Sequence, residues 1–261
     1  MNRSLLAAAA ACLTLPVMPA SATLLLDFGT TAYVGTDSPA HEDGNATGTN
    51  WNNVSGDVAA GGLVDEQGDA LPGVGIDFGV GTIGSINYAN GVRADTRDHS
   101  AFPLWDSGLG EDHLFRDIAS EGPAIALAVT GLAPGVYDYY VTAFRGDNAT
   151  NASRNYDVYA ATSAAAVTDF SGAFADEILN SDPTTANDWI AGDHYATGTF
   201  TITAAGEAFY VAVDSPSPAG PAESPFIGVI SSLEIVPVPE PSSALLAAAG
   251  LGLLGVRRGR A

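Results

Sequence analysis

The sequence predicts an all-β protein, an antiparallel β-sandwich or jelly roll, preceded by a cleaved signal peptide and followed by a short transmembrane helix. Three observations predict this class. Short runs rich in Val, Ile, Tyr and Phe recur along the chain, and clusters of Gly, Pro, Asn and Asp separate them. No stretch of the middle sustains the i, i+3, i+4, i+7 apolar pattern of a helix over three turns. Many short strands with polar turns are typical of sandwiches and jelly rolls.

Residues 1–22 have the layout of a secretory signal peptide. Arg3 supplies a positive charge, residues 4–17 are almost wholly apolar, and residues 20–22 place small side chains at the A-x-A positions. Pro16 and Pro19 would break a buried helix here, which argues against that alternative. We expect export by the Sec machinery and cleavage after Ala22. The only cysteine, Cys12, lies in this leader, so we expect a mature chain without disulfides.

The expected domain covers residues 23–236. Its strands are predicted, in chain order, at residues 24–28, 74–78, 124–129, 136–144, 156–159, 196–203, 208–213 and 227–236. Residues 132–135 form the clearest turn, because Pro134 presets one turn angle and Gly135 supplies the next. Residues 112–119 are the one place where we expect a short helix.

Charge excludes two classes of partner. The chain has no lysine and a formal net charge of −21, and residues 23–238 contain 29 acidic residues against five arginines. Affinity for phosphates needs clustered Lys and Arg, so nucleic acid and anionic membrane surfaces are excluded as natural partners. An acidic surface of this kind suits a saline habitat or calcium binding.

The segment 237–261 has an ordered series of features. Pro239, Glu240 and Pro241 precede an apolar, helix-compatible run of fifteen residues, 242–256, which is short for a membrane span of roughly 20. Arg257, Arg258 and Arg260 follow, as the positive-inside rule requires of a cytoplasmic end. This order resembles the PEP-CTERM sorting signal of bacterial exported proteins. The resemblance implies that an exosortase removes the tail, after transient anchoring in the inner membrane, and passes the protein to the cell surface or biofilm matrix. The alternative is a plain C-terminal anchor.

Three stretches resemble galactose-binding-like β-sandwiches of surface proteins and carbohydrate-active enzymes. They are the opening 26–29 with 50–53 after it, the turn-to-strand unit 131–137, and the pair 144–145 with 154–156. This resemblance implies a module that contacts carbohydrate and assigns no residue a role.

The tryptophan loops are the candidates for recognition. Trp51 lies among asparagines, with Asn52 and Asn53 directly after it, and Trp105 stands between Leu104 and Asp106. An exposed indole offers a flat apolar face to a sugar ring, while amide groups bond its hydroxyls. Trp51, Asn52, Asn53 and Trp105 are therefore the candidate ligand residues. The alternative for each tryptophan, Trp189 included, is a place at the rim of the core.

Acidic side chains crowd one region together with Trp105 and His113. We take five of them as candidate calcium ligands: Asp95, Asp98, Asp106, Glu111 and Asp112. Two of these carboxylates at suitable separation would instead suit a glycosidase, and a solvated acidic surface is the third alternative.

No motif favours another chemistry. The G-x-G-x-x-G at residues 79–84 lacks the helix of a dinucleotide site, and neither G-x-S-x-G nor H-E-x-x-H occurs. We expect an exported, exosortase-sorted, non-catalytic protein that contacts exopolysaccharide. The alternatives are a secreted glycan hydrolase or lyase using the loop carboxylates, and a purely structural matrix protein.

Overall fold

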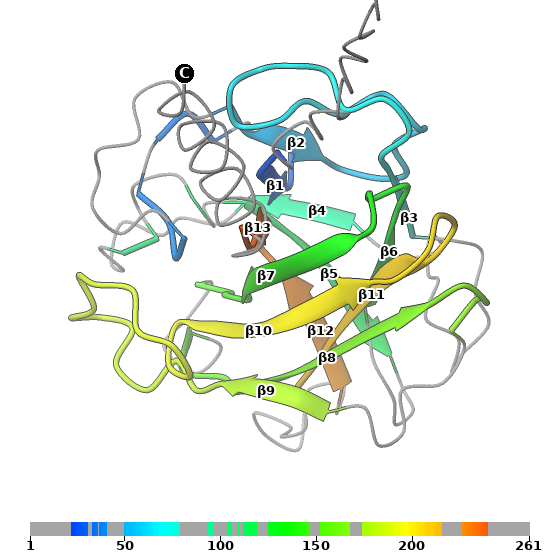
Figure 1. The fold of residues 1–261 in the computed structure, drawn as a ribbon. Coiled ribbons are helices and arrows are strands. Elements are labelled where there is room, and N and C mark those ends of the chain that lie inside the picture. Colours follow the sequence, from blue (N-terminus) through cyan, green and yellow to red (C-terminus); the bar gives the residue numbers. More distant parts are fainter. Residues whose placement is uncertain are drawn as a thin grey trace, which may run out of the picture.

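The computed structural model describes residues 22–30, 33–35, 37–40, 50–78, 93–96, 104–105, 109, 112–118, 125–146, 152–167, 174–215 and 226–239. Within them the regular elements are strands (Figure 1). These are β1 (Leu24–Phe28), β2 (Asn52–Val54), β3 (Gly75–Asp77), β4 (Arg93–Thr96), β5 (Asp112–Ile118), β6 (Ile125–Thr130), β7 (Gly135–Thr142), β8 (Tyr156–Ser163), β9 (Phe174–Ile178), β10 (Tyr195–Ile202), β11 (Ala208–Asp214), β12 (Phe226–Ile230) and β13 (Ser232–Pro237).

The strands form three sheets. The first sheet has the order β10-β7-β13-β1-β2, the second β3-β6-β11-β8-β9, and the third β12-β5-β4. Every pairing is antiparallel except that of β1 with β2, which is parallel. The predicted all-β class and its antiparallel sheets are confirmed.

One hydrophobic core joins the two large sheets. Alternate residues of each strand point into it, as in any two-layer sheet packing. Leu26 and Phe28 of β1 belong to the same buried cluster as Val211 and Val213 of β11. The core holds the two layers together by burial of apolar area.

The predicted strand 227–236 is two strands in different sheets. β12 belongs to the third sheet and β13 to the first, and Ser231 lies between them. The Ser231 amide donates to the carbonyl of Thr142, and its own carbonyl accepts from the amide of Phe28 (both 2.9 Å). Gly228 lets β12 cross the second sheet closely, since a Cβ there would lie 2.5 Å from the Ile125 nitrogen. The apolar run is continuous in sequence, but the chain changes sheets at Ser231.

The prediction of a helix at residues 112–119 is wrong. Residues 112–118 form β5, which pairs with β4 on one side and β12 on the other. Two strand partners satisfy its backbone, and this tertiary pairing overrides a weak local preference. β2, β4 and β9 were not predicted from the sequence.

Several predicted features lie outside the described residues. They are the signal peptide up to residue 21, the glycine motif at 79–84, and the tail from Glu240 onward. In the part of the chain that the structure describes, no helix is long and apolar enough to cross a membrane.

Candidate functional site

The outer face of the first sheet carries two buried carboxylates, Asp27 and Glu234. Strand alternation turns Leu26 and Ile235 into the core and their neighbours outward. Asp27 of β1 lies opposite Ser232 of β13, and Glu234 lies opposite both Leu25 and Tyr140. The outer face therefore places two carboxylates on adjacent strands, in neighbouring rows.

Residues 33–40 cover these two carboxylates. The Tyr33 amide donates to Asp27 Oδ2, and the Ser38 hydroxyl donates to Glu234 Oε2, both at 2.8 Å. Asp27 is 1% exposed and Glu234 is fully buried. A buried carboxylate is stabilised only where donors reach it, so the two hydrogen bonds fix residues 33–40 on the sheet.

Tyr33 stays a neutral phenol under this cover. Burial, together with the nearby carboxylates of Asp37, Glu234 and Asp27, raises the pKa of Tyr33 to about 12. Its hydroxyl donates to the Asp37 carbonyl at 2.8 Å. The ring is thereby held in place as a rigid aromatic wall.

Trp51 lies against that wall at the edge of the sheet. The rings of Tyr33 and Trp51 pack edge to face, with centroids 5.2 Å apart and planes at 72°. Trp51 is half-buried, and its Nε1 faces inward without a hydrogen-bond partner among the described residues. Asn53, two residues on and opposite Asp27, is exposed. An apolar ring surface and an amide therefore stand next to each other at the rim.

The other two candidate ligand residues occupy interior positions. The Asn52 amide donates to the carbonyls of Leu25 (3.0 Å) and Val64 (2.8 Å), and its oxygen accepts from the Val64 amide (2.8 Å). Through these bonds the Asn52 side chain connects β1 to Val64. Trp105 is fully buried and stacks on Phe144 at 3.9 Å. Burial leaves the Trp105 indole no exposed face for a sugar.

All three tryptophans meet in one aromatic cluster, which was not predicted from the sequence. Trp105 packs edge to face on Trp189 (6.1 Å) and on His194 (5.4 Å), and Trp51 packs against the cluster from its edge. The residues come from loops more than fifty positions apart, so no local spacing announces the cluster. Trp105 and Trp189 are both buried in this cluster.

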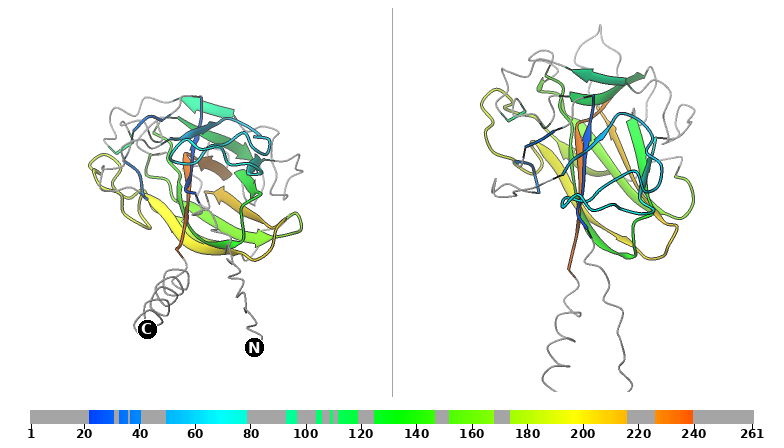
Figure 2. Two further views of the ribbon diagram at one scale, coloured as in Figure 1. Left: turned by 45° about the horizontal axis from the view of Figure 1, so that its top comes forward. Right: turned by 90° about the horizontal axis from the view of Figure 1, so that it is seen from above.

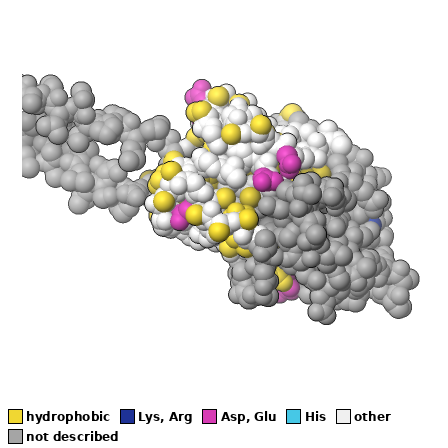
Figure 3. Space-filling view, turned by 90° about the vertical axis from the view of Figure 1, so that its right-hand side faces the viewer, with side chains coloured by type: hydrophobic (Ala, Val, Ile, Leu, Met, Phe, Trp, Pro, Cys, Tyr) yellow, Lys and Arg dark blue, Asp and Glu magenta, His cyan; other side chains and the backbone are white. Residues whose placement is uncertain are grey.

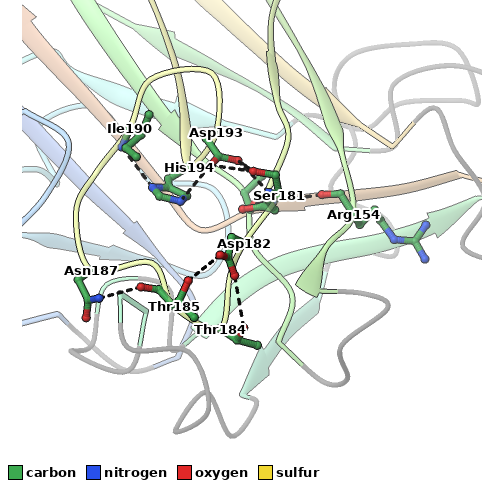
Figure 4. A network of polar contacts seen from close by, with 11 residues as sticks. Arg154, Ser181, Asp182, Thr184, Thr185, Asn187, Ile190, Asp193 and His194 are labelled. Carbon is green, nitrogen blue, oxygen red and sulfur yellow. Dashed lines mark hydrogen bonds and ion pairs between the residues drawn. The ribbon is translucent and has the colours of Figure 1, made fainter.

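A Ser–Asp–His arrangement stands beside this cluster (Figure 4). Asp193 lies in its middle: the Ser181 hydroxyl donates to both carboxylate oxygens (2.9 and 3.0 Å), and His194 Nε2 lies 3.5 Å from Asp193 Oδ2. His194 Nδ1 accepts from the Ile190 amide (3.2 Å). A catalytic triad needs the histidine between serine and carboxylate, so that it can take the serine proton. Here the serine hydroxyl donates to the Asp193 carboxylate instead of to the histidine, and the network ties together the loop that carries Trp189.

The candidate calcium ligands all lie outside the described side chains. Asp98, Asp106 and Glu111 lie outside the described residues, whereas the backbone places Asp95 opposite His113 and Asp112 opposite Thr96 in the β4–β5 pair. Among the side chains that the structure describes, no group of three or more His, Cys, Asp or Glu is arranged to hold a metal ion.

A separate row of acids crosses the second sheet. Asp214 of β11 lies opposite Asp157 of β8, which lies opposite Glu177 of β9. Burial raises the pKa of Asp214 to about 7; the Ser215 amide, which bonds its carboxylate, opposes the shift, and Asp157 adds to it. Burial and the Glu177 charge likewise raise the pKa of Asp157. Like charges directly opposite each other destabilise a sheet, so this row lowers the stability of the folded state.

The comparisons with known proteins identify the C-terminal segment. Residues 237–261 match the family model of the PEP-CTERM protein-sorting motif. The match implies an exported protein with a C-terminal membrane anchor that an exosortase processes. Among curated proteins, none matches this chain.

Solved structures show distant similarity to parts of this chain. A protein from Bacillus subtilis, YXIM, aligns with 83% of this chain and 40% of its own at 13% identity and a TM-score of 0.39. An exo-beta-1,3-galactanase from Phanerochaete chrysosporium aligns with 58% of this chain and 28% of its own (10% identity, TM-score 0.25). A xylan-binding module aligns with 60% of this chain and 96% of its own (14% identity, TM-score 0.25). The chain thus spans less than half of the Bacillus subtilis protein and of the galactanase, and at these TM-scores the similarities assign no function.

Proposed function

We propose that this protein is a non-catalytic component of the cell surface or extracellular matrix, which contacts exopolysaccharide after an exosortase has sorted it. The observation that supports this most is the rim of the first sheet, where half-buried Trp51 stands beside exposed Asn53. Sugar rings stack on indole faces, and amides bond their hydroxyls. Tyr33 holds the indole from behind, so little side-chain entropy is lost when a ring stacks on it.

The charge of the protein limits the kinds of polysaccharide that it can bind. The chain carries a formal net charge of −21 without a single lysine. Figure 3 shows carboxylates scattered over one side of the described domain, among small hydrophobic side chains. An acidic surface repels an anionic polymer, and the repulsion weakens as salt rises. We therefore expect a neutral polysaccharide, or an anionic one only where calcium bridges the two.

A secreted glycan hydrolase or lyase remains the alternative. Its candidate carboxylates, Asp95, Asp98, Asp106, Glu111 and Asp112, would have to flank a glycosidic bond at roughly 5–10 Å. The Ser181–Asp193–His194 network does not favour it, because the histidine does not contact the serine. Release of reducing ends from a bound polysaccharide distinguishes this alternative from a binding module.

A glycan array tests the proposal. The mature protein, purified from an exosortase-bearing host, is applied with calcium and then with chelator. We expect binding that Trp51→Ala weakens at least tenfold, equivalent to about 1.4 kcal/mol. Val34→Ala is the matched control, since Val34 is 90% exposed next to Tyr33 and should not affect binding. Trp105 and Trp189 are buried, so ligand-dependent tryptophan fluorescence should report on Trp51. An array blank under both conditions, or binding indifferent to Trp51→Ala, would contradict the proposal.

A further inference from the structure

The described domain begins and ends at the same place. Leu24 at the start of β1 lies opposite Ile235 near the end of β13. Figure 2 shows these two strands side by side in both views. The Thr23 carbonyl accepts from the Glu66 amide at 3.1 Å, so the chain is fixed one residue after the expected signal-peptide cleavage site. Both membrane-targeting segments therefore join the sandwich at one end, which we call the exit end.

No spacer separates the sandwich from the sorting motif. The Val238 amide still donates to the Val136 carbonyl at 2.9 Å, and Pro239 is the next residue. Three residues lie between Val238 and the start of the apolar run at Ser242, and the four steps from Val238 to Ser242 reach about 14 Å when fully extended. The headgroup layer of one leaflet takes about 6 Å of that reach. While the tail is anchored, the exit end lies within about 8 Å of the membrane surface.

Three turns form the described part of the exit end. Residues 131–134 lead into β7, residues 203–207 join β10 to β11, and residues 65–69 are bonded to Thr23. The first two lie together because Gly135 at the start of β7 pairs with Ile202 at the end of β10. These turns contain Asp65, Glu66, Asp69 and Glu207 and neither lysine nor arginine. Such a surface is repelled by anionic headgroups, which attract basic segments.

We propose that the exit end docks directly on the membrane-embedded sorting enzyme, so that the enzyme binds the folded end of the sandwich together with the motif at Pro239, Glu240 and Pro241. The inference rests on the exosortase processing that the tail implies, and not on the polysaccharide proposal. Because the tail reaches only a short distance, the exit end must contact whatever lies at the membrane surface around the tail. The acidic charge of the exit end favours contact with a protein surface that carries basic groups over contact with the bilayer.

The experiment follows tail removal from the full chain in a host that processes the wild type. A ten-residue Gly/Ser spacer is inserted between Val238 and Pro239, and separately Asp69, an exposed acid of the exit end, is changed to lysine. Asp188→Lys is the matched control, because Asp188 is also exposed but lies on the loop before β10, at the opposite end of that strand. Thermal unfolding of each purified product checks the fold.

We expect the spacer and Asp69→Lys each to slow tail removal at least threefold, Asp188→Lys to leave it unchanged, and Asp69→Lys to add nothing once the spacer is present. Processing that is unchanged or faster with the spacer would overturn the proposal, because the enzyme would then read the motif alone. Faster processing of Asp69→Lys would assign the contact to anionic lipid instead. A Glu240→Ala chain processed as well as wild type would refute exosortase sorting itself, a different failure from that of docking.

Discussion

Asp214, the buried member of the acid row in the second sheet, leads to a prediction about stability and pH. Asp214 is 5% exposed, and its Oδ1 has no hydrogen-bond partner among the described residues. Its carboxylate lies opposite Asp157, and no described lysine or arginine pairs with it. The perturbation is Asp214→Asn, which removes the charge and keeps the shape of the side chain.

The direction in which stability changes with pH follows from the protons that the folded and unfolded states bind. Burial raises the pKa of Asp214 from 3.8 to about 7, so the native state holds a proton that the unfolded state releases between those two values. Stability from this group is complete below about pH 4, is lost as the pH rises toward 7, and changes no further above it. Three pKa units at 1.36 kcal/mol each give a cost of at most about 4 kcal/mol at pH 8. The asparagine variant avoids this cost.

Urea unfolding of wild type and variant at pH 4 and pH 8 measures the effect. We expect Asp214→Asn to equal the wild type within about 1 kcal/mol at pH 4 and to be more stable by a few kcal/mol at pH 8. Taking the difference between the two proteins cancels the general repulsion among the other acids. Asp157→Asn, the neighbour control, should show a smaller gain of the same sign, because it removes one cause of the Asp214 shift. A stability gain of Asp214→Asn that is the same at both pH values, or a loss at pH 8, would contradict a raised pKa of Asp214 in the folded state.

Three further substitutions test the packing by thermal or urea unfolding. Trp105→Ala should cost about 3–5 kcal/mol, since the indole is fully buried against Phe144; a cost below 1 would contradict its core position. Gly131→Ala should cost more than about 2 kcal/mol, because φ is +74° and a Cβ would fall 1.8 Å from the Gly73 oxygen; a neutral result would contradict this close approach. Asn180→Ala should cost about 1–3 kcal/mol, since its amide bonds the carbonyls of residues 143 and 154, and unchanged stability would show those bonds to be dispensable.

Strands whose sequence alternates or is uniformly apolar were predictable. β7, β10 and β11 lie within two residues of their predicted bounds, because their side chains pack in a core that the pattern already implies. Strands that form only because neighbouring strands pair with them were not predictable. β5 depends on β4 and β12 for its backbone bonds, and β2 is only three residues long. The turn glycine was also misplaced: the positive φ belongs to Gly131 and not to Gly135.

The site was predictable only as a set of residue types. Trp51, directly before β2, and Asn53 within it lie at the rim of the first sheet, while the alternation of side chains turns Asn52 inward. Nothing in the sequence around Asp27 or Glu234 shows that residues 33–40 bury both. The aromatic cluster likewise depends on contacts between distant loops, which a single sequence does not reveal.

Co-sedimentation with exopolysaccharide purified from the producing bacterium tests whether the protein contacts polysaccharide, with reducing ends assayed in the same samples. We expect the mature protein to sediment with the polymer and no reducing ends to appear. Trp51→Ala should lower the bound fraction at least tenfold, and Val34→Ala should not. Reducing ends that accumulate with time would show a hydrolase, and a mature protein that stays in solution with every polymer preparation would contradict contact with polysaccharide.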